Sequence, residues 1–382
     1  MIKSIKIMLK PNNKQKSLLF QCVGTARFAF NWALAREEEN YKAGNKFISD
    51  CDLRKELTQL KKTEEFSWLK NYSNDIPKQA IKDACDAYKK FFKGLSKKPK
   101  FKSKRKSRPS FYGDTIKTKF GERHVYLSKI GYIRLAEHNR IPEGSKIMNP
   151  RITHDGLNWW ISVGIEVLEI DTTDECTEPI GIDLGIKDFA VLSDGKVYKN
   201  INKSRTIKRA TKALKRLQRR ASRQYKRLKN NKKEGENRYK KSANLIKLEK
   251  KILKLYKRMS NIRDNYIHQI TTALVKTKPE YIVIEDLNVS GMMKNRHLSK
   301  AVMNQKFYEF RRILTYKCSL YGIPLFIADR FYPSSKTCSE CGHIKKDLKL
   351  KDRTYICPEC GIVLDRDLNA AINLREYPRS VA

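Results

Sequence analysis

Acidic residues are scarce in this sequence relative to basic ones. The 382 residues include 41 Asp and Glu against 82 Lys and Arg, so the formal net charge is +41. Self-repulsion of this size opposes compaction unless a polyanionic partner neutralises it. The lysines concentrate in a few stretches and are interleaved with tyrosine, phenylalanine and arginine, which favours nucleic acid over a membrane surface as that partner.

Long apolar runs are also absent. No stretch approaches the length of a membrane-spanning helix, and no secretory signal peptide is visible. Instead, Ile5, Ile7 and Leu9 alternate with polar residues, which predicts a β-strand. Four of the nine cysteines form a paired cluster and the others are scattered, so they do not make the disulfide framework of a secreted protein. These features predict a protein of the reducing cytosol without a membrane partner.

Histidine is rare, and its rarity disfavours several catalytic schemes. The chain has six histidines, no His-hydrophobe-His motif and no GxSxG elbow. A serine or cysteine nucleophile therefore has little to support a catalytic triad. Tyrosine transposases need the His-hydrophobe-His metal motif, so that class is excluded as well.

The first half of the chain combines helices with short strands. Apolar residues recur at helical spacing over 14–43 and 77–95, which predicts the core of a small helical bundle. The basic segment 97–111 follows, and its charge density excludes a core while its aromatic residues suit contact with nucleic acid. From 123 to 170, short alternating segments predict a β-rich unit of barrel type, to which the first strand returns.

The second half begins after a polar, acidic stretch at 171–179, which predicts a linker. Strands are expected within 180–198, where an Asp-Gly pair gives a hairpin signal, and again within 280–289 and 323–330. Apolar periodicity predicts a helix over 305–321.

A helical hairpin is expected over 203–275. Apolar residues repeat at intervals of three and four along both arms, and the polar turn 230–237 separates them, so the arms pack antiparallel. No acidic residue occurs between Gly195 and Lys233. A solvated helix normally mixes both signs of charge, so this arm predicts a nucleic-acid cradle. Its most crowded basic residues are Arg216, Arg219, Arg220 and Arg223.

Two CxxC pairs make the strongest local signal. The motifs CSECG and CPECG hold pairs separated by 15 residues, a spacing typical of a four-cysteine zinc ribbon. The glycine after each pair permits the turn of a metal knuckle. Four thiolates close a tetrahedral shell, so the zinc ion is expected to be structural and its binding to fold the segment. The predicted ligands are Cys338, Cys341, Cys357 and Cys360.

Three carboxylates stand where a structural role is hard to justify. Asp183 interrupts the apolar strand IGIDLGI between Gly181 and Gly185, two glycines that permit close approach of a backbone or a phosphate. Glu285 ends the apolar run YIVIE, and Asp367 lies near the start of a helix. Hard oxygen ligands suit Mg²⁺ or Mn²⁺, and two such ions can drive phosphodiester hydrolysis. The order of strand Asp, strand Glu and helix Asp matches a ribonuclease H-like nuclease.

Four other acids in these segments are rivals for the same role. Asp188 follows the first acidic strand and Asp365 precedes the helix, so supporting or capping roles are expected of these two. Asp286 and Asp329 are the other rivals. Three acids alone also leave a DDE-type transposase as an alternative, which the zinc ribbon directly before Asp367 disfavours.

The motifs as a whole resemble the TnpB family. GIDLGIKDFAVLSDG, VIEDLNVSGMMKNR, FYPSSKTCSECG and VLDRDLNAAINL resemble, in order, its RuvC and zinc-ribbon signatures. LKPNNKQKSLLFQCVGTARFAFN, AYKKFFKG and KPKFKSK resemble its N-terminal blocks, so the resemblance covers essentially the whole chain. Proteins of this family are encoded beside or in place of the transposase gene in bacterial and archaeal insertion sequences, and are similar to the compact ancestors of type V CRISPR effectors.

The resemblance implies an α+β multidomain fold. A wedge-type β-barrel would carry an inserted helical recognition lobe, and a RuvC or ribonuclease H-like α/β nuclease domain would carry an inserted zinc ribbon. The implied ranges are 1–10 and 106–172 for the barrel, 11–105 for the lobe, 173–330 and 361–382 for the nuclease domain, and 331–360 for the ribbon.

The resemblance also implies an RNA-guided DNA endonuclease that supports transposition or retention of its insertion sequence. Such a protein binds a guide RNA from the transposon end and cleaves matching double-stranded DNA beside a short transposon-adjacent motif. Asp183, Glu285 and Asp367 match the catalytic acids, which would hold Mg²⁺ or Mn²⁺, and the four cysteines match the ligands of one structural Zn²⁺. The implied location is the nucleoid of a bacterial or archaeal cytoplasm.

Three residues outside the hairpin are candidate nucleic-acid contacts. Gln79, which opens the second predicted helix, is expected to face the flanking DNA motif, and Lys104 and Arg105 belong to the basic segment. A guide-bound DNA-binding regulator that does not cut is the alternative function, and the intact acids disfavour it. The sequence makes no prediction of the oligomeric state.

Overall fold

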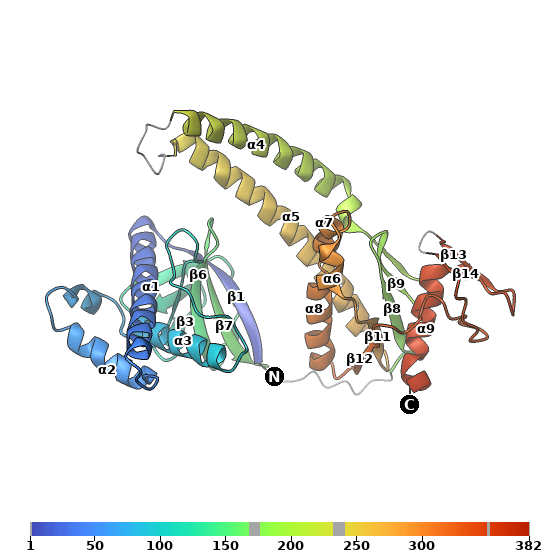
Figure 1. Ribbon diagram of the computed structural model, residues 1–382, viewed down its shortest axis with the longest axis horizontal. Helices are drawn as coiled ribbons and strands as arrows, with labels where there is room; N and C mark the ends of the chain where they lie inside the picture. The colour runs from blue at the N-terminus through green and yellow to red at the C-terminus, as the bar shows by residue number, and fades with distance from the viewer. Residues whose placement is uncertain (1, 168–175, 232–240, 350–351, 382) are drawn as a thin grey trace. The chain divides into compact units, whose positions relative to one another are not determined.

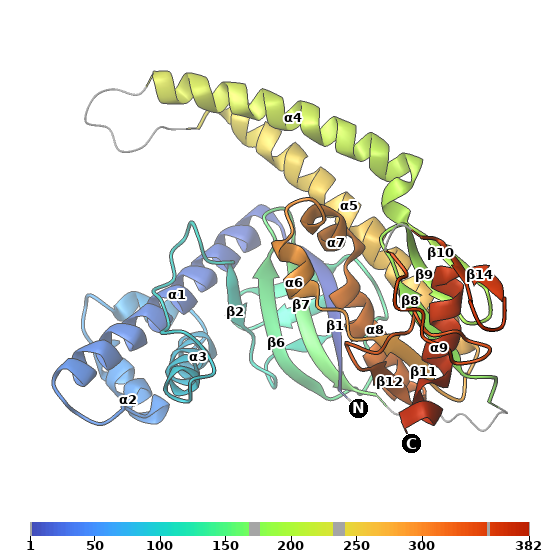
Figure 2. The same ribbon diagram turned by 45° about the vertical axis from the view of Figure 1, so that its right-hand side comes forward.

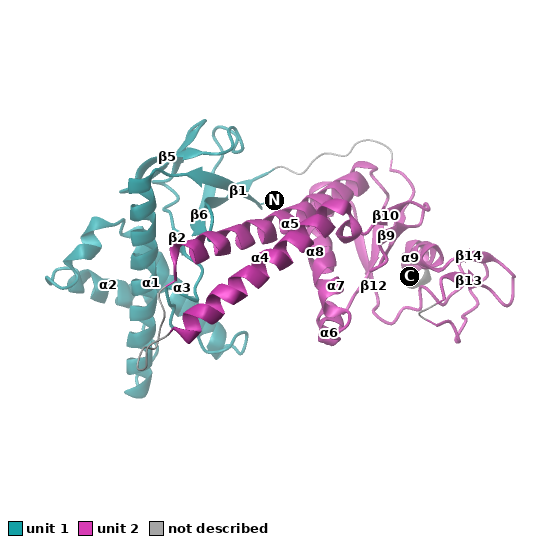
Figure 3. Ribbon diagram, turned by 90° about the horizontal axis from the view of Figure 1, so that it is seen from above, with its two compact units in different colours: residues 1–167 teal, residues 168–382 magenta. Residues whose placement is uncertain are grey.

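The computed structural model describes residues 2–167, 176–231, 241–349 and 352–381. The chain divides into two compact units, residues 1–167 and 168–382 (Figure 3). Most of the predicted linker at 171–179 and of the predicted turn at 230–237 falls outside the described residues. In the described part of the chain, no helix has the length and apolar character needed to cross a membrane.

Unit 1 is built around a seven-stranded sheet in which the described pairings are antiparallel. Its middle strand is β1 (Ile2–Lys10), which pairs with β7 (Trp159–Glu166) and β5 (Gly131–Leu135). The predicted return of the first strand to the β-rich unit is therefore confirmed. The other strands are β2 (Ser110–Tyr112), β3 (Lys119–Phe120), β4 (His124–Leu127) and β6 (Ile147–His154).

A closed barrel is not confirmed for this sheet. The strands follow the order β2-β6-β7-β1-β5-β4-β3, and no pairing among the described residues joins β2 to β3. The sheet nevertheless has one inward face, because side chains alternate along each strand. Ile5, Ile7 and Leu9 are buried, as their alternation predicted. Phe111 of β2 is buried too, so this end of the basic segment contributes to the core, contrary to the sequence-based expectation.

Three helices share the hydrophobic core of this sheet: α1 (Asn13–Lys42), α2 (Asp50–Leu60) and α3 (Asp75–Phe92) (Figures 1 and 2). A short 3-10 helix, Ser67–Asn71, precedes α3. The helix α1 begins with a capping box in which Asn12 and Gln15 exchange side chain to backbone bonds at 2.8 and 3.0 Å. Both predicted helices are therefore present, with ends that differ by a few residues.

Unit 2 contains a five-stranded mixed sheet with the order β10-β9-β8-β11-β12. The strands β8, β11 and β12 are parallel, whereas β9 pairs antiparallel with both β8 and β10. Because a parallel connection needs a crossover, long helical segments separate the parallel strands in the sequence. The bounds are β8 (Ile180–Leu184), β9 (Asp188–Leu192), β10 (Val197–Lys199), β11 (Ile282–Glu285) and β12 (Leu325–Ala328).

Helices cover both faces of this sheet (Figures 1 and 2). The helices α5 (Ala243–Lys276) and α8 (Phe307–Leu320) pack on the face that carries Ile182 and Ile284. The helix α9 (Arg366–Val381) packs on the opposite face, where its Leu374 meets Val283. Two short helices, α6 (Val289–Lys294) and α7 (Ser299–Gln305), connect β11 to α8.

The close approach of α9 to the sheet depends on Gly181. A Cβ atom at this position would lie 2.0 Å from the carbonyl oxygen of Ala371 and 2.4 Å from the amide nitrogen of Arg375. No side chain fits in that space, so any larger residue would push α9 away from β8. The predicted close approach is thus confirmed, and its partner is the backbone of α9.

The predicted helical hairpin consists of α4 (Arg205–Asn230) and α5, which pack along an apolar seam (Figure 1). Ala221 of α4 packs against Leu245 and Leu248 of α5, close to the far end of the hairpin. A 3-10 turn, Ile201–Lys203, precedes α4. The seam matches the apolar repeats in the sequence, so the antiparallel hairpin is confirmed.

Candidate active site and cysteine cluster

Asp183 and Glu285 lie side by side at the carboxyl ends of two parallel strands. The register pairs Ile182 of β8 with Ile284 of β11, so the two acids occupy the next position along each strand. Successive side chains alternate between faces, and both acids therefore share the face of Gly181, which α9 covers. The two carboxyl groups lie close enough that each one shifts the pKa of the other.

The first turn of α9 adds Asp367 to this pair. Asp365 caps the helix, because its carboxylate accepts hydrogen bonds from the N–H groups of Asp367 (2.9 Å) and Leu368 (3.2 Å). The capping role predicted for Asp365 is therefore confirmed. The Asp367 carboxylate is partly buried and lies 3.6 Å from the guanidinium of Arg353.

The pKa values of Asp183 and Glu285 are shifted by their surroundings. Burial raises the pKa of Asp183 well above its ordinary value, and the charges of Glu285 and Asp367 raise it further. Burial also raises the pKa of Glu285, although hydrogen bonds from Ser334 and Asp183 work in the opposite direction. A buried group of like charges with hard oxygen donors is suited to a divalent cation such as Mg²⁺ or Mn²⁺. The residues present fit such an ion.

We expect Asp183→Asn to stabilise the protein in buffer without added divalent metal, and the gain to grow as pH rises. A carboxyl group with a raised folded-state pKa contributes stability that is full below the unfolded pKa and is lost as pH rises through the folded pKa. Asparagine cannot lose that proton. Near neutral pH the melting temperature of the unit that spans residues 168–382 should rise by about 2 °C, the shift that about 1 kcal/mol produces in a unit of this size.

Thermal unfolding of both variants between pH 4.5 and pH 8 would measure this effect. Added Mn²⁺ should stabilise the wild-type protein more than Asp183→Asn, because the metal relieves the repulsion that the substitution has already removed. A melting-temperature difference that stays constant across the pH range would contradict the electrostatic account.

The four predicted cysteines come together in one cluster. Their Sγ atoms all lie within 4.8 Å of one another, and Cys338 and Cys357 are buried. Although burial opposes ionisation, N–H groups of Cys360 and Glu359 lower the pKa of the Cys357 thiol to about 6. The thiolate is the form that binds zinc. Among the described residues, no other group of three or more His, Cys, Asp or Glu has ligand atoms so close together, and the three acids are spaced more widely.

The cysteines lie on a small ribbon beside α9. Its strands are β13 (Thr354–Ile356) and β14 (Val363–Asp365), which pair antiparallel. Tyr355 of β13 is fully buried among the cysteines. A core this small cannot fold the segment alone, so the geometry agrees with a structural zinc ion held by four sulfurs.

The other rival acids have partners of their own. Asp188 lies 3.3 Å from Lys199, and Asp286 pairs with Arg311 (2.6 Å) and Arg330 (2.5 Å). These two arginines hold the pKa of Asp286 below its ordinary value. Asp329 accepts a hydrogen bond from the N–H of Phe331 in a turn. None of these acids joins the group around Asp183.

The basic residues of α4 form one exposed face. Arg216, Arg219, Arg220 and Arg223 follow the spacing of a single helix face and are all exposed. No described acidic residue forms an ion pair with any of them. Four exposed guanidinium groups on one helix face, with no ion-pair partner among the described residues, are typical of a surface that contacts a phosphate backbone.

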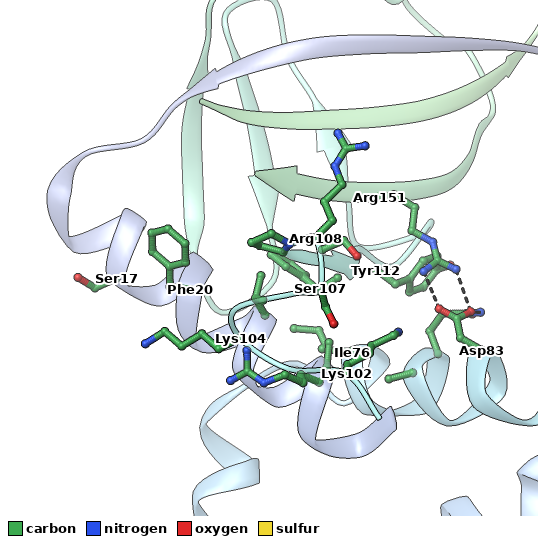
Figure 4. A pocket seen from close by; sticks show the side chains of 18 residues that line it. Ser17, Phe20, Ile76, Asp83, Lys102, Lys104, Ser107, Arg108, Tyr112 and Arg151 are labelled. Carbon is green, nitrogen blue, oxygen red and sulfur yellow. Dashed lines mark hydrogen bonds and ion pairs between the residues drawn. The ribbon is translucent and has the colours of Figure 1, made fainter. Parts of the chain in front are cut away.

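Gln79 and Lys104 line a cavity of about 530 Å³ in unit 1 (Figure 4). The amide of Gln79 donates to Asp83 at 2.9 Å, and Arg151 donates to both oxygens of that aspartate at 2.7 and 3.0 Å.

Arg105, in the basic segment, is exposed and does not line the cavity. The Asn31 side chain bonds to the backbone N–H and carbonyl of Lys102, which holds the basic segment against α1.

Sequence reasoning missed three buried polar residues near the acids. Ser334 donates to Glu285, and Asn369 and Asn373 of α9 bond to the segment that precedes Cys338. The two asparagines are four residues apart on the apolar face of an otherwise amphipathic helix. Buried amides at that spacing are the signal that could have indicated a docked partner.

Three family models match the chain. They are described as "Helix-turn-helix domain" over residues 1–46, "Probable transposase" over 162–296 and "Cas12f1-like, TNB domain" over 307–374. The last range contains the cysteine ribbon and Asp367. The middle range contains Asp183, Glu285 and the helical hairpin.

Curated relatives align with nearly the whole chain. The chain is 30% identical to "Putative RNA-guided DNA endonuclease InsQ" of Escherichia coli, over 98% of this chain and 91% of the relative. It is 31% identical to a "Putative RNA-guided DNA endonuclease" of Streptomyces pristinaespiralis, over 97% of this chain and 88% of the relative. In fold it is similar to Cas12f1 in a cryo-EM complex with sgRNA and target DNA, with a TM-score of 0.60 and 13% identity over 98% of each chain.

Proposed function

The chain belongs to the TnpB family, and from this premise we propose that it is a transposon-encoded, RNA-guided DNA endonuclease. The observation that carries this proposal is the meeting of Asp183, Glu285 and Asp367 on one face of the unit 2 sheet. These three acids are far apart in the sequence but close together in the fold, although repulsion between their negative charges opposes that arrangement. A cation-dependent reaction on a polyanion explains that arrangement best.

We assign the nuclease domain to the ribonuclease H-like, RuvC-type class. The strand order β10-β9-β8-β11-β12, with three antiparallel strands followed by two parallel ones, supports this assignment. The wedge-type barrel and its inserted lobe remain our proposal for unit 1. The domain boundaries set out from the sequence are part of the same proposal.

The three acids share one part in the proposed reaction. Asp183, Glu285 and Asp367 would hold Mg²⁺ or Mn²⁺, which supplies an activated water and charge stabilisation for phosphodiester hydrolysis. Both carboxyl groups must be ionised to act as ligands, and burial opposes that ionisation by raising the pKa of each. Arg366 lies close enough for its charge to favour that ionisation in both acids.

The partners we propose are a guide RNA and double-stranded target DNA. The net charge of +41 needs a polyanion of this kind, and the curated relatives carry the name of RNA-guided DNA endonucleases. We propose that the RNA derives from the transposon end and that cleavage occurs beside a short transposon-adjacent motif. The exposed arginines of α4 and the segment with Lys104 and Arg105 are proposed contacts to the backbone, and Gln79 to the flanking motif.

Reprogrammed cleavage tests this function directly. RNA that copurifies with the protein would be sequenced, and its guide portion replaced to match a plasmid. We expect cleavage of the matched plasmid only, and only when Mg²⁺ or Mn²⁺ is present. Tight binding without cleavage would favour a DNA-binding regulator, and strand-transfer products would favour a DDE-type transposase.

A further inference from the structure

A buried hydroxyl group holds the Glu285 carboxylate from outside the strands. Ser334 Oγ donates to Glu285 Oε1 at 3.1 Å, and Ser334 is only 5% exposed. A hydroxyl that served only the turn would bond to the backbone, as Thr337 does with the carbonyl of Pro333 at 3.0 Å. The Ser334 hydroxyl instead holds one oxygen of the Glu285 carboxylate. It therefore restricts rotation of that carboxylate.

Ser334 is itself held in place by α9. Asn373 Nδ2 donates to the carbonyls of Ser334 and Thr337, both at 2.7 Å. In return, the Tyr332 hydroxyl donates to the carbonyl of Asn373 at 3.2 Å. The turn that carries Ser334 is thus fixed to the helix that carries Asp367. A shift of this turn would move the hydroxyl away from Glu285.

One turn before Asn373, α9 also bonds to the segment around Cys338. Asn369, which is fully buried, donates to the carbonyl of Thr337 at 2.7 Å and accepts from the N–H of Ser339 at 3.0 Å. Thr337 and Ser339 flank Cys338. The cysteine ribbon, α9 and Glu285 are therefore joined by one continuous set of hydrogen bonds that are at least partly buried.

We propose that Ser334 is a positioning residue for the Glu285 carboxylate, and that Asn373 acts through Ser334 to couple the cysteine ribbon to the nuclease site. This inference rests on the proposed function of the three acids. It gives the ribbon a role beyond its own folding. The ribbon sets the position of an acid that it does not contain.

The Ser334→Ala substitution tests the first part, with Ser335→Ala as its matched control. Ser335 is the next residue, and its hydroxyl makes no hydrogen bond with a described residue. In the full chain freed of nucleic acid, Ser334→Ala should bind Mn²⁺ about tenfold more weakly, as expected for loss of a partner that orients a metal ligand. The cleavage reaction should require correspondingly more Mg²⁺. Ser334→Thr, which keeps the hydroxyl, should restore most of the affinity.

The zinc content and guide RNA affinity of Ser334→Ala should match those of the wild-type protein. Equal Mn²⁺ affinity in Ser334→Ala and Ser335→Ala would overturn the proposal. Loss of zinc from Ser334→Ala would also overturn it, because the residue would then be merely structural. If the wild-type protein did not cleave DNA but Ser334→Ala still weakened Mn²⁺ binding, the proposed function would fail and the positioning role would stand.

A double-mutant cycle tests the second part. Asn373→Ala should weaken Mn²⁺ binding in the same direction as Ser334→Ala. Because both act through one hydroxyl, the double variant should bind Mn²⁺ no more weakly than the worse single variant. Losses that multiply would overturn the coupling through Ser334.

Discussion

Cleavage of guide-matched DNA is expected to stop when Asp183 is replaced by asparagine, while guide RNA binding is retained. Asparagine keeps the size of the side chain and one oxygen but removes the negative charge that would hold the metal. We expect the cleavage rate to fall at least ~10³-fold, which corresponds to about 4 kcal/mol of lost transition-state stabilisation. Single-turnover cleavage of a labelled duplex by the ribonucleoprotein measures the rate.

Asp188→Asn is the matched control for this substitution. Asp188 begins β9, in the same hairpin as Asp183, but it pairs with Lys199 on β10 and stands apart from the group of three acids. Its substitution should change the rate less than about threefold, because its ion pair with the exposed Lys199 lies outside the group of three acids and contributes about 1 kcal/mol or less. If the two variants lost activity equally, or if Asp183→Asn lost RNA binding, the catalytic assignment of Asp183 would be wrong.

The second large effect is expected from Cys338→Ser. A serine hydroxyl does not ionise at neutral pH and is a poor zinc ligand, so the variant should lose most of its bound zinc. Free energies of zinc binding on the order of 10 kcal/mol stabilise small four-ligand segments. The ribbon should therefore unfold, and cleavage should fall together with the zinc content because the ribbon docks on α9. Atomic emission and thermal unfolding of the purified protein measure the two effects.

Cys51→Ser controls for the loss of a thiol. Cys51 is exposed in unit 1 and is not one of the four clustered cysteines. This variant should keep one equivalent of zinc and the wild-type melting temperature. Full zinc occupancy in Cys338→Ser would contradict the assignment of Cys338 as a ligand.

Long periodic segments made much of the fold predictable from the sequence. The apolar repeats of α1 and of the α4–α5 hairpin extend over many turns, so a few exceptions do not hide the pattern. The helix α2 escaped prediction because only Leu53 and Leu57 of its 11 residues are buried. Barrel closure could not be judged at all, since it depends on pairing between strands at opposite ends of the sheet rather than on any local pattern.

The residues of the candidate site also differ in how far a local sequence pattern can predict them. A carboxylate within an apolar strand costs free energy wherever it occurs, so Asp183 and Glu285 stand out without any knowledge of their neighbours. Ser334 carries no such signal, because a serine in a turn is ordinary until a distant carboxylate is found beside it. Gln79 illustrates the opposite case. The sequence predicts that Gln79 faces the flanking DNA motif. Its side-chain amide already donates a hydrogen bond to Asp83, which no sequence pattern indicates.

The helix α9 is the last element of the chain to be synthesised, and this affects when the protein can become active. The helix supplies Asp367, covers Gly181 and holds the turn of Ser334, yet the ribosome makes it after the sheet, the hairpin and the ribbon. Contacts between α9 and β8 cannot form until α9 has been synthesised, and contacts so far apart in sequence are slow to form. A nascent chain therefore exposes its basic hairpin to RNA before its third carboxylate exists. The polypeptide can acquire a nucleic-acid partner while it is still unable to cut one.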